Sequence, residues 1–337
     1  MEKVYFIAME DFSDKNKVNE ASKKLLAKVD PGFSGSIPLK IHFGEKGNIT
    51  FIKPENYEGI IEYLKDKKCE PFFTDTNVLY KGSRTITKDH LETAKDHGFT
   101  QIPVRIADEE DKVTEIKIKL KHFDSFFIGK RIADAKQMLV ISHFKGHMMA
   151  GFGGAIKQLA MGCANRRGKL AMHAHAKPIL NPLKCTKCMT CTKHCPVDAC
   201  IISKIPHVDK KKCIGCAMCI AVCPSGAMTI NWLAVRPKTF NEMLAEYAFA
   251  AQKDKEVTYI SFATQITKHC DCEGTEMKPI AKDLGLLASR DPIALDQACL
   301  DLIRKQEGKK VFSGEHTLEY GEEIGLGSRK YELITLD

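Results

Sequence analysis

A tandem cysteine pattern constrains this chain more than any other feature of its sequence. Two runs of four cysteines repeat the same spacing of two, two and three intervening residues, and each run ends in proline. The runs comprise Cys185, Cys188, Cys191 and Cys195, then Cys213, Cys216, Cys219 and Cys223. Three thiolates at this spacing wrap a tight loop around one iron–sulfur cubane, whose fourth iron takes a ligand from a distance. The spacing therefore predicts two [4Fe–4S] clusters.

The doubled run resembles the bacterial two-cluster ferredoxins, in which the fourth cysteine of each run ligates the other cluster. We assign one cluster to Cys185, Cys188, Cys191 and Cys223, and the other to Cys213, Cys216, Cys219 and Cys195. Zinc sites use cysteine pairs and disulfides suit short secreted proteins, so both fit this pattern less well. One intact cluster beside a degraded or [3Fe–4S] cluster stays an alternative. Cys200, just after the first run, is expected to be a small buried side chain.

The composition limits the cellular compartment in which this protein is expected and the partners that it is expected to bind. The 337 residues are 44% hydrophobic, which suffices for one large core and a small module. No apolar run approaches a membrane span, and the first residues do not resemble a secretory signal. Free thiols and iron–sulfur ligands indicate a reducing, oxygen-poor cytoplasm. The net charge of +8 falls to about +4 with two clusters of about −2 each, and lysines are not interleaved with aromatics, so nucleic-acid binding is not expected.

Outside the cysteine pattern, strand-like and helix-like segments alternate, which predicts an α/β fold. Strands are expected at 37–43, 70–74, 102–107, 113–120, 138–142, 257–262 and 331–336. Helices are expected at 14–28, 54–67, 87–97, 132–136, 154–161, 239–252 and 291–304. The predicted architecture is a large mixed or parallel-sheet α/β domain, residues 1–177 and 234–337, interrupted by a ferredoxin-like module at 178–233.

Three polar groups follow predicted strands. They are Asp75-Thr-Asn77, the loop from His143 to Lys157, and the segment His269–Cys272. Ligands of open α/β sheets bind outside the carboxyl ends of the strands, so these groups, with His173 and His175, would form a cationic pocket with metal-ligating potential.

Each group also has a structural interpretation. Asp75 is equally well explained by backbone hydrogen bonds in a turn. The glycine-rich stretch 151–157 lacks the Gly-Lys-Ser/Thr ending of a phosphate loop, so nucleotide hydrolysis is not expected. Its glycines Gly153 and Gly154 instead allow close backbone approach to a ligand or cluster.

Two further motifs lie later in the chain. Cys270 and Cys272 would point to opposite faces of an extended segment, so a shared metal would require a turn there. Burial of at least one of the two is the structural alternative. Asp291 before Pro292 has the form of a helix N-cap, whereas Asp296 receives no function from the sequence.

Together these segments resemble the family called domain of unknown function 362, in its form with an inserted two-cluster ferredoxin. The segments are Asp75-Thr-Asn77 with Tyr80 and Arg84, residues 142–163, Cys270-Asp-Cys272, and the stretch from Asp291 to Asp296 with Gln297 and Ala298. The resemblance covers almost the whole chain, but the family supplies no reaction.

A shorter stretch is similar to the nickel-pincer lactate racemases. It comprises His147, Gly153-Gly154, Lys157 and His173, at the spacing those enzymes use. The resemblance implies that Lys157 holds a cofactor covalently, that His173 ligates a metal, and that His147 acts in proton or hydride chemistry. Those racemases lack the cysteine runs, so the stretch indicates a related fold and pocket position more than the same cofactor.

Three hypotheses for function stay open. The first is an iron–sulfur oxidoreductase or electron-transfer protein, whose electrons pass between the clusters and a substrate or cofactor in a pocket around His147, Lys157 and His173. The second is an electron carrier or docking subunit of a larger redox complex, without catalysis of its own. The third is a protein that handles a metal or organic cofactor. A redox partner protein is expected in the first two, and a small-molecule substrate in the first.

Overall fold

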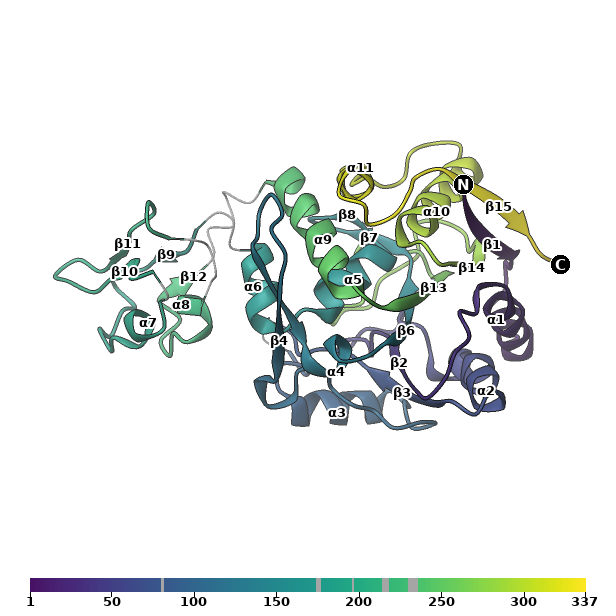
Figure 1. Cartoon of the computed structure of the whole chain (residues 1–337), viewed down its shortest axis with the longest axis horizontal. Coiled ribbons are helices and arrows are strands. Elements are labelled where there is room, and N and C mark those ends of the chain that lie inside the picture. Colours follow the sequence, from purple (N-terminus) through teal and green to yellow (C-terminus); the bar gives the residue numbers. More distant parts are fainter. Residues whose placement is uncertain (80–81, 174–176, 196, 214–217, 230–235) are drawn as a thin grey trace.

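One mixed sheet organises the molecule. The computed structural model describes residues 1–79, 82–173, 177–195, 197–213, 218–229 and 236–337. Seven strands pair in the order β15-β1-β14-β13-β6-β2-β3 (Figure 1). Their bounds are β1 Glu2–Ala8, β2 Ser36–Lys40, β3 Glu70–Thr74, β6 Gln137–His143, β13 Glu256–Ala263, β14 Gly285–Ser289 and β15 Tyr331–Thr335. β14 is antiparallel to both neighbours and the other pairs are parallel, which confirms the α/β fold class.

The sheet is buried on both faces because its strands are apolar at successive positions. Along β6, Met138 and Val140 join one hydrophobic cluster, whereas Leu139 and Ile141 join another on the opposite face. Neighbouring residues of a strand point to opposite faces, so such a run needs cover on both sides.

Helices supply that cover in two layers (Figure 1). One layer contains α1 (Lys15–Val29), η1 (Pro54–Tyr57), α2 (Glu58–Asp66) and α3 (Thr87–Asp96). The other contains α4 (Lys130–Ala133), α5 (Ala155–Cys163), α6 (Arg166–His173), α9 (Pro237–Gln252), α10 (Pro292–Glu307) and α11 (His316–Glu323). Two hairpins flank the second layer, β4 (Val113–Lys117) with β5 (Ser125–Gly129), and β7 (Lys145–His147) with β8 (Gly151–Gly153). The two clusters of side chains thus form the core on either side of the sheet.

Most expected elements are present, with two corrections. The expected strand at 102–107 is wrong, because Val104 makes only an isolated bridge to Phe73. Pro103 has no N–H group with which to extend a ladder. The strand expected at 37–43 ends at Lys40, which places His42 in the loop beyond it. The strands β1, β5 and β14 and the helices α6 and α11 were not predicted.

The cysteine-rich segment, residues 178–229, lies to one side of the sheet and its helices (Figure 1). Its described elements are β9 (Ile179–Leu180), α7 (Thr190–Lys193), β10 (Cys200–Ile201), β11 (His207–Val208), α8 (Met218–Ala221) and β12 (Met228–Thr229). Cys191, Cys200, Cys219 and Met228 form a cluster of buried side chains in this segment, so Cys200 is buried as expected. The predicted residues Cys216, Tyr80, His175 and Pro196, and 230–233 at the end of the predicted module, lie outside the described residues.

Helix α8 lies next to α6. This neighbourhood links the cysteine-rich segment to the layer that holds α5 and α9. Within the described part of the chain, no helix combines the length and apolar character needed to cross a membrane.

Candidate functional site

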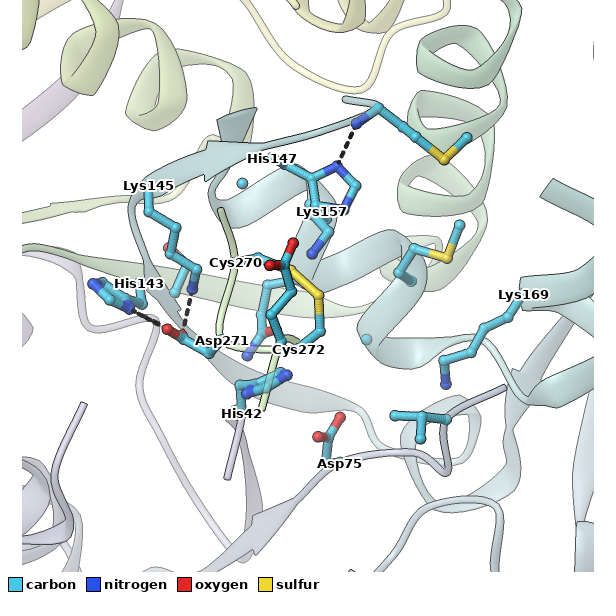
Figure 2. A pocket seen from close by; sticks show the side chains of 18 of the residues that line it. His42, Asp75, His143, Lys145, His147, Lys157, Lys169, Cys270, Asp271 and Cys272 are labelled. Atoms are coloured by element: carbon cyan, nitrogen blue, oxygen red, sulfur yellow. Dashed lines mark hydrogen bonds and ion pairs between the residues drawn. A yellow bond between two sulfur atoms is a disulfide. The ribbon is translucent and has the colours of Figure 1, made fainter. Parts of the chain in front are cut away.

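Four adjacent parallel strands, β13, β6, β2 and β3, end at the same edge of the sheet. A cavity of about 400 Å³ opens there, which we call the strand-end cavity (Figure 2). The site residues expected outside the cysteine pattern all line it: Asp75, His147, Gly153, Gly154, Lys157 and His173. The carboxyl ends of parallel strands are the usual ligand position in such sheets, which explains why segments distant in sequence meet here.

Asp75 is the centre of a group of ion pairs, and it also accepts a hydrogen bond from the backbone N–H of Thr76 at 2.9 Å. Its carboxylate lies 2.9 Å from Lys40 Nζ and 3.3 Å from an Arg84 guanidinium nitrogen, and all three side chains are buried. Burial alone would raise the pKa of Asp75, but Lys40, His90, His42 and Arg84 together hold this pKa below its ordinary value. Asp75 is therefore ionised and already paired, which makes it a poor proton donor.

His143 and Lys145 clamp Asp271. The carboxylate of Asp271 lies 2.9 Å from His143 Nδ1 and 2.6 Å from Lys145 Nζ. His143 Nε2 lies 2.6 Å from the carbonyl oxygen of Thr264, so both ring nitrogens face oxygen atoms. Burial would raise the pKa of Asp271, but His143 and Lys145 outweigh it and lower this pKa well below the ordinary value. The clamp fixes the segment that carries Cys270 and Cys272.

Lys157 contributes a second kind of charge to the cavity, an ammonium group with no side-chain hydrogen bond or ion pair among the described residues. Burial, and then the positive charge of Lys145, lower the pKa of Lys157 to about 7. An amine of this kind is partly unprotonated near neutral pH and can act as a nucleophile or base.

Asp296 fixes the backbone that follows Gly154. The Asp296 carboxylate accepts from the backbone N–H groups of Ala155 at 2.7 Å and Ile156 at 3.0 Å, and so caps the N-terminus of α5. A Cβ on Gly154 would lie 2.2 Å from Asp296 Oδ1. Because these N–H groups at the start of α5 already donate to Asp296, they are not available to bind a phosphate. This agrees with the expectation that residues 151–157 are not a phosphate loop.

His147 adjoins the two cysteines of the motif at 270–272. A turn at Asp271 brings Cys270 and Cys272 to the same side, where they form a disulfide. A ligand atom of His147 and the two sulfurs lie within 4.8 Å of one another, so these three residues could hold a metal ion only with the disulfide reduced to thiolates. The turn that the sequence argument required for a shared site is present.

Lys169 occupies the far wall of the cavity. Its ammonium donates to the hydroxyl of Thr76 at 2.5 Å and to the carbonyl oxygens of Asn77 at 2.7 Å and Ala164 at 2.8 Å. These partners are neutral, so the charge of Lys169 adds to that of Lys157. The cavity therefore suits an anionic ligand or a developing negative charge.

The structure also brings one predicted cluster set together. A small cavity in the cysteine-rich segment is lined by Cys185, Cys188, Cys191 and Cys223. Cys223 lies 32 positions after Cys191 in the chain, so the fold brings it to the other three. Of the second predicted set, Cys219 is buried, and Cys195 packs against the same cluster of side chains. Cys213 is half-buried, and Cys216 lies outside the described residues.

Several cavity residues were not predicted as site residues. His42, Lys145, Lys169 and Asp271 line the cavity, and Lys40 supports it from within the sheet. Lys40 and His42 could have been found from the sequence. They are the polar residues of the otherwise apolar run 37–43, and polar side chains are unusual in a buried strand. Lys169 gave no such signal, since it belongs to an unpredicted helix.

Two solved structures are similar to this chain at low identity. A crystal structure of a protein from Thermotoga maritima matches with 11% identity over 94% of this chain and 61% of that chain, with a TM-score of 0.43. The lactate racemase apoprotein from Thermoanaerobacterium thermosaccharolyticum matches with 11% identity over 78% of this chain and 50% of that chain, with a TM-score of 0.39. This chain thus spans less than two thirds of either of them.

Among curated proteins, none matches this chain. A family match does exist, and it covers the strand-end cavity and the cysteine-rich segment alike. It extends over residues 37–301, and the chain therefore belongs to the family described as Domain of unknown function (DUF362).

Proposed function

We propose that this protein is an iron–sulfur protein with two [4Fe–4S] clusters, which exchanges electrons between a redox partner and the strand-end cavity. The observation that carries the proposal is the convergence of Cys185, Cys188, Cys191 and Cys223 on one small cavity. Three closely spaced cysteines with a distant fourth form the ligand set of one cubane. Cys213, Cys216, Cys219 and Cys195 would hold the second.

The neighbourhood of the second cluster supports a route into the cavity. Cys219 belongs to α8, which lies next to α6, and α6 ends at His173 in the wall of the strand-end cavity. His173 stacks on Phe240 with ring centroids 5.2 Å apart, and Phe240 lines the same cavity. A cluster held by Cys219 would therefore lie on the side of the molecule from which His173 reaches the cavity.

The charge of the cysteine-rich segment favours an acidic partner. Residues 178–229 contain seven lysines and two aspartates. Even with about −4 contributed by two clusters, this segment stays positive, so an acidic electron-transfer protein fits it by charge complementarity. The buried free thiols of Cys69, Cys163 and Cys299 agree with a reducing, oxygen-poor cytoplasm as the place of action.

A second candidate function is the binding of an additional organic or metal cofactor in the strand-end cavity. The residues fit such a group, because Lys157 lacks an anionic partner among the described residues and His173 lines the same cavity. Lys157 would hold the cofactor through its amine, and His173 would offer a ring nitrogen to a metal. A bound group of this kind would supply the hydride or electron chemistry, while His147 would act as an acid or base beside it.

Anaerobic purification with iron analysis and paramagnetic resonance tests the main proposal. We expect about eight irons per chain and the signals of two reduced cubanes, and Cys188→Ala should lower the iron content by up to half. Cys69→Ala, which changes a buried cysteine outside the pattern, should keep all eight. The assignment would be contradicted if the unaltered protein contained far fewer than eight irons per chain. It would also be contradicted if Cys188→Ala kept the iron content of the unaltered protein.

The same preparation separates an active cavity from a docking role. Lys157→Ala should retain both cluster signals. If Lys157 participates in redox chemistry, this variant loses electron transfer from the reduced clusters to an acceptor in the cavity. Unchanged transfer to a partner protein would instead favour the docking subunit. Mass spectrometry of the protein purified without oxygen would identify any group attached to Lys157.

A further inference from the structure

We propose that Cys270 and Cys272 form a redox-active dithiol–disulfide pair, which accepts two electrons from the iron–sulfur clusters one at a time. The proposal names the electron acceptor of the strand-end cavity, and it rests on the proposed function for the source of the electrons. The pair is joined as a disulfide and lines the cavity, so its sulfurs lie where a ligand would reach them.

The backbone holds both sulfurs on one side whatever their oxidation state. The N–H group of Glu273 donates to the carbonyl oxygen of Cys270 at 3.0 Å, which closes a turn around Asp271. The carboxylate of Asp271 is held by His143 and Lys145 (Figure 2). Because ion pairs fix the middle residue, reduction leaves two thiols side by side instead of releasing the loop.

His147 is placed to serve the sulfurs as a hydrogen-bond donor. Its Nδ1 accepts from the backbone N–H groups of Ala150 at 3.0 Å and Met149 at 3.3 Å. A neutral ring whose Nδ1 lone pair is engaged carries its proton on Nε2. A ring in this tautomer donates a hydrogen bond and does not bind a metal through Nε2. His147 thus suits a thiolate formed next to it better than it suits a metal ion.

The charge of the cavity also favours the reduced form. Reduction creates thiolate sulfur, and Lys157 lies in the same cavity with no anionic partner among the described residues (Figure 2). A nearby ammonium stabilises a thiolate and supplies a proton to it. Cys270 is only 3% exposed, so its sulfur is reached through the cavity and not from the open surface of the protein.

The chemical setting separates this disulfide from a structural one. The chain keeps buried free thiols at Cys69, Cys163 and Cys299, as is usual in reducing compartments. Disulfides in such compartments are mostly catalytic or redox-sensing. A bridge between residues two apart closes a very short loop, so it removes little freedom from the unfolded chain and adds little stability. Redox chemistry is the role that remains for it.

The step balances with electrons from an external one-electron donor and with protons from the Lys157 ammonium and the solvent. Each reduced cluster gives one electron and returns to its oxidised state. Two electrons break the S–S bond between Cys270 and Cys272, and two protons complete two thiols. The external donor is a one-electron carrier such as the acidic redox protein proposed above. The pair therefore converts two one-electron carriers into one two-electron store inside the cavity.

A reductive titration of the anaerobic holoprotein with dithionite tests the proposal. We expect an uptake of about four electrons per chain, about two for the clusters and about two for the disulfide. Differential alkylation with peptide mass spectrometry should show Cys270 and Cys272 changing from a disulfide to two labelled thiols during the titration. Cys272→Ser should lower the uptake to about two with unchanged paramagnetic signals, and the control Cys69→Ala should keep about four.

Two results would overturn the proposal. In the first, both clusters are fully reduced while the peptide with Cys270 and Cys272 stays disulfide-linked. In the second, the purified protein holds the pair as thiols bound to one stoichiometric metal ion, which Cys272→Ser releases. Failure of the proposed function is a distinct outcome, because the protein then contains no cubane iron. In that protein dithiothreitol would still reduce the disulfide directly.

Discussion

At the scale of single residues, the strand-end cavity separates paired charges from one unpaired amine. Asp75 and Asp271 each lie between cations and are held ionised, whereas Lys157 has no anionic partner among the described residues. A buried ion pair contributes little net stability, but breaking it leaves a charge without compensation. The paired residues thus maintain the shape of the cavity, and the unpaired amine is left for chemistry.

The unusual acidity of Lys157 is measurable. Because burial and Lys145 lower its pKa to about 7, the amine loses its proton as the pH rises through about 7. We expect acetylation of Lys157 by trace acetic anhydride to reach half its maximal rate near that pH. Lys112 is the control, since hydrogen bonding to Glu110 raises the pKa of this exposed lysine. Equal labelling profiles of the two lysines would contradict the expectation.

Removing the charge of Asp75 should be costly. Asp75→Asn leaves Lys40 and Arg84 without one of their anionic partners, so we expect the free energy of unfolding to fall by about 3 kcal/mol. Denaturant titration of the purified variant provides the measurement. Asp11→Asn, at an exposed position, should change it by less than about 0.5 kcal/mol. A similarly small loss for Asp75→Asn would show that these charges are not effectively buried.

At the scale of elements, α5 connects the sheet to the cavity. It follows β8, places Lys157 in its first turn, and packs against α9 and α10. Its N-terminus is capped from α10 by Asp296, a residue 141 positions later than Ala155. A cap from a distant helix fixes the direction of α5 and hence the position of Lys157.

Loss of this cap should loosen α5. Asp296→Ala leaves two buried backbone N–H groups without acceptors, so we expect the free energy of unfolding to fall by about 1–3 kcal/mol. Amide hydrogen exchange of Ala155 and Ile156 should rise together with this loss. Asp296→Asn keeps one acceptor oxygen and should lose less. Unchanged exchange in Asp296→Ala would mean that other groups replace the cap.

At the scale of the whole molecule, the sheet is assembled from both sides of the cysteine-rich segment. β13 pairs with β6 and β14 pairs with β1, so strands after the segment complete a sheet begun before it. The segment itself has strands of two residues and a buried cluster made largely of cysteines. Its order should therefore depend on the iron–sulfur clusters that we propose for it, whereas the order of the sheet should not.

Iron removal followed by limited proteolysis tests this difference. We expect the iron-free protein to be cut within 178–229, while fragments close to 1–177 and 234–337 stay associated through the sheet. The iron-loaded protein should resist cleavage under the same conditions. Cleavage that begins in β6 or β13, or fragments that separate on gel filtration, would contradict the discontinuous domain.

Much of the fold followed from local patterns, and much of the site did not. The helix at 15–29 was predictable from the N-cap Asp14, and α10 from Asp291, whose carboxylate accepts from Ala294 N–H at 2.9 Å. The strand expected at 102–107 was wrong because an apolar run does not reveal a missing pairing partner. Asp296 had no assigned role, since its partners lie in another helix.

The sequence by itself determined the cysteine spacing, the α/β alternation and the positions of polar groups at strand ends. These depend on short-range geometry, namely the reach of a loop around a cubane and the periodicity of helices and strands. Only the tertiary structure decided that Lys157 has no anionic partner among the residues that the structure describes, while Asp75 is paired. It also decided that Cys270 and Cys272 share one side of a turn beside His147. Such facts depend on which distant charges and backbone groups become neighbours, and that is fixed when the strands assemble into the sheet.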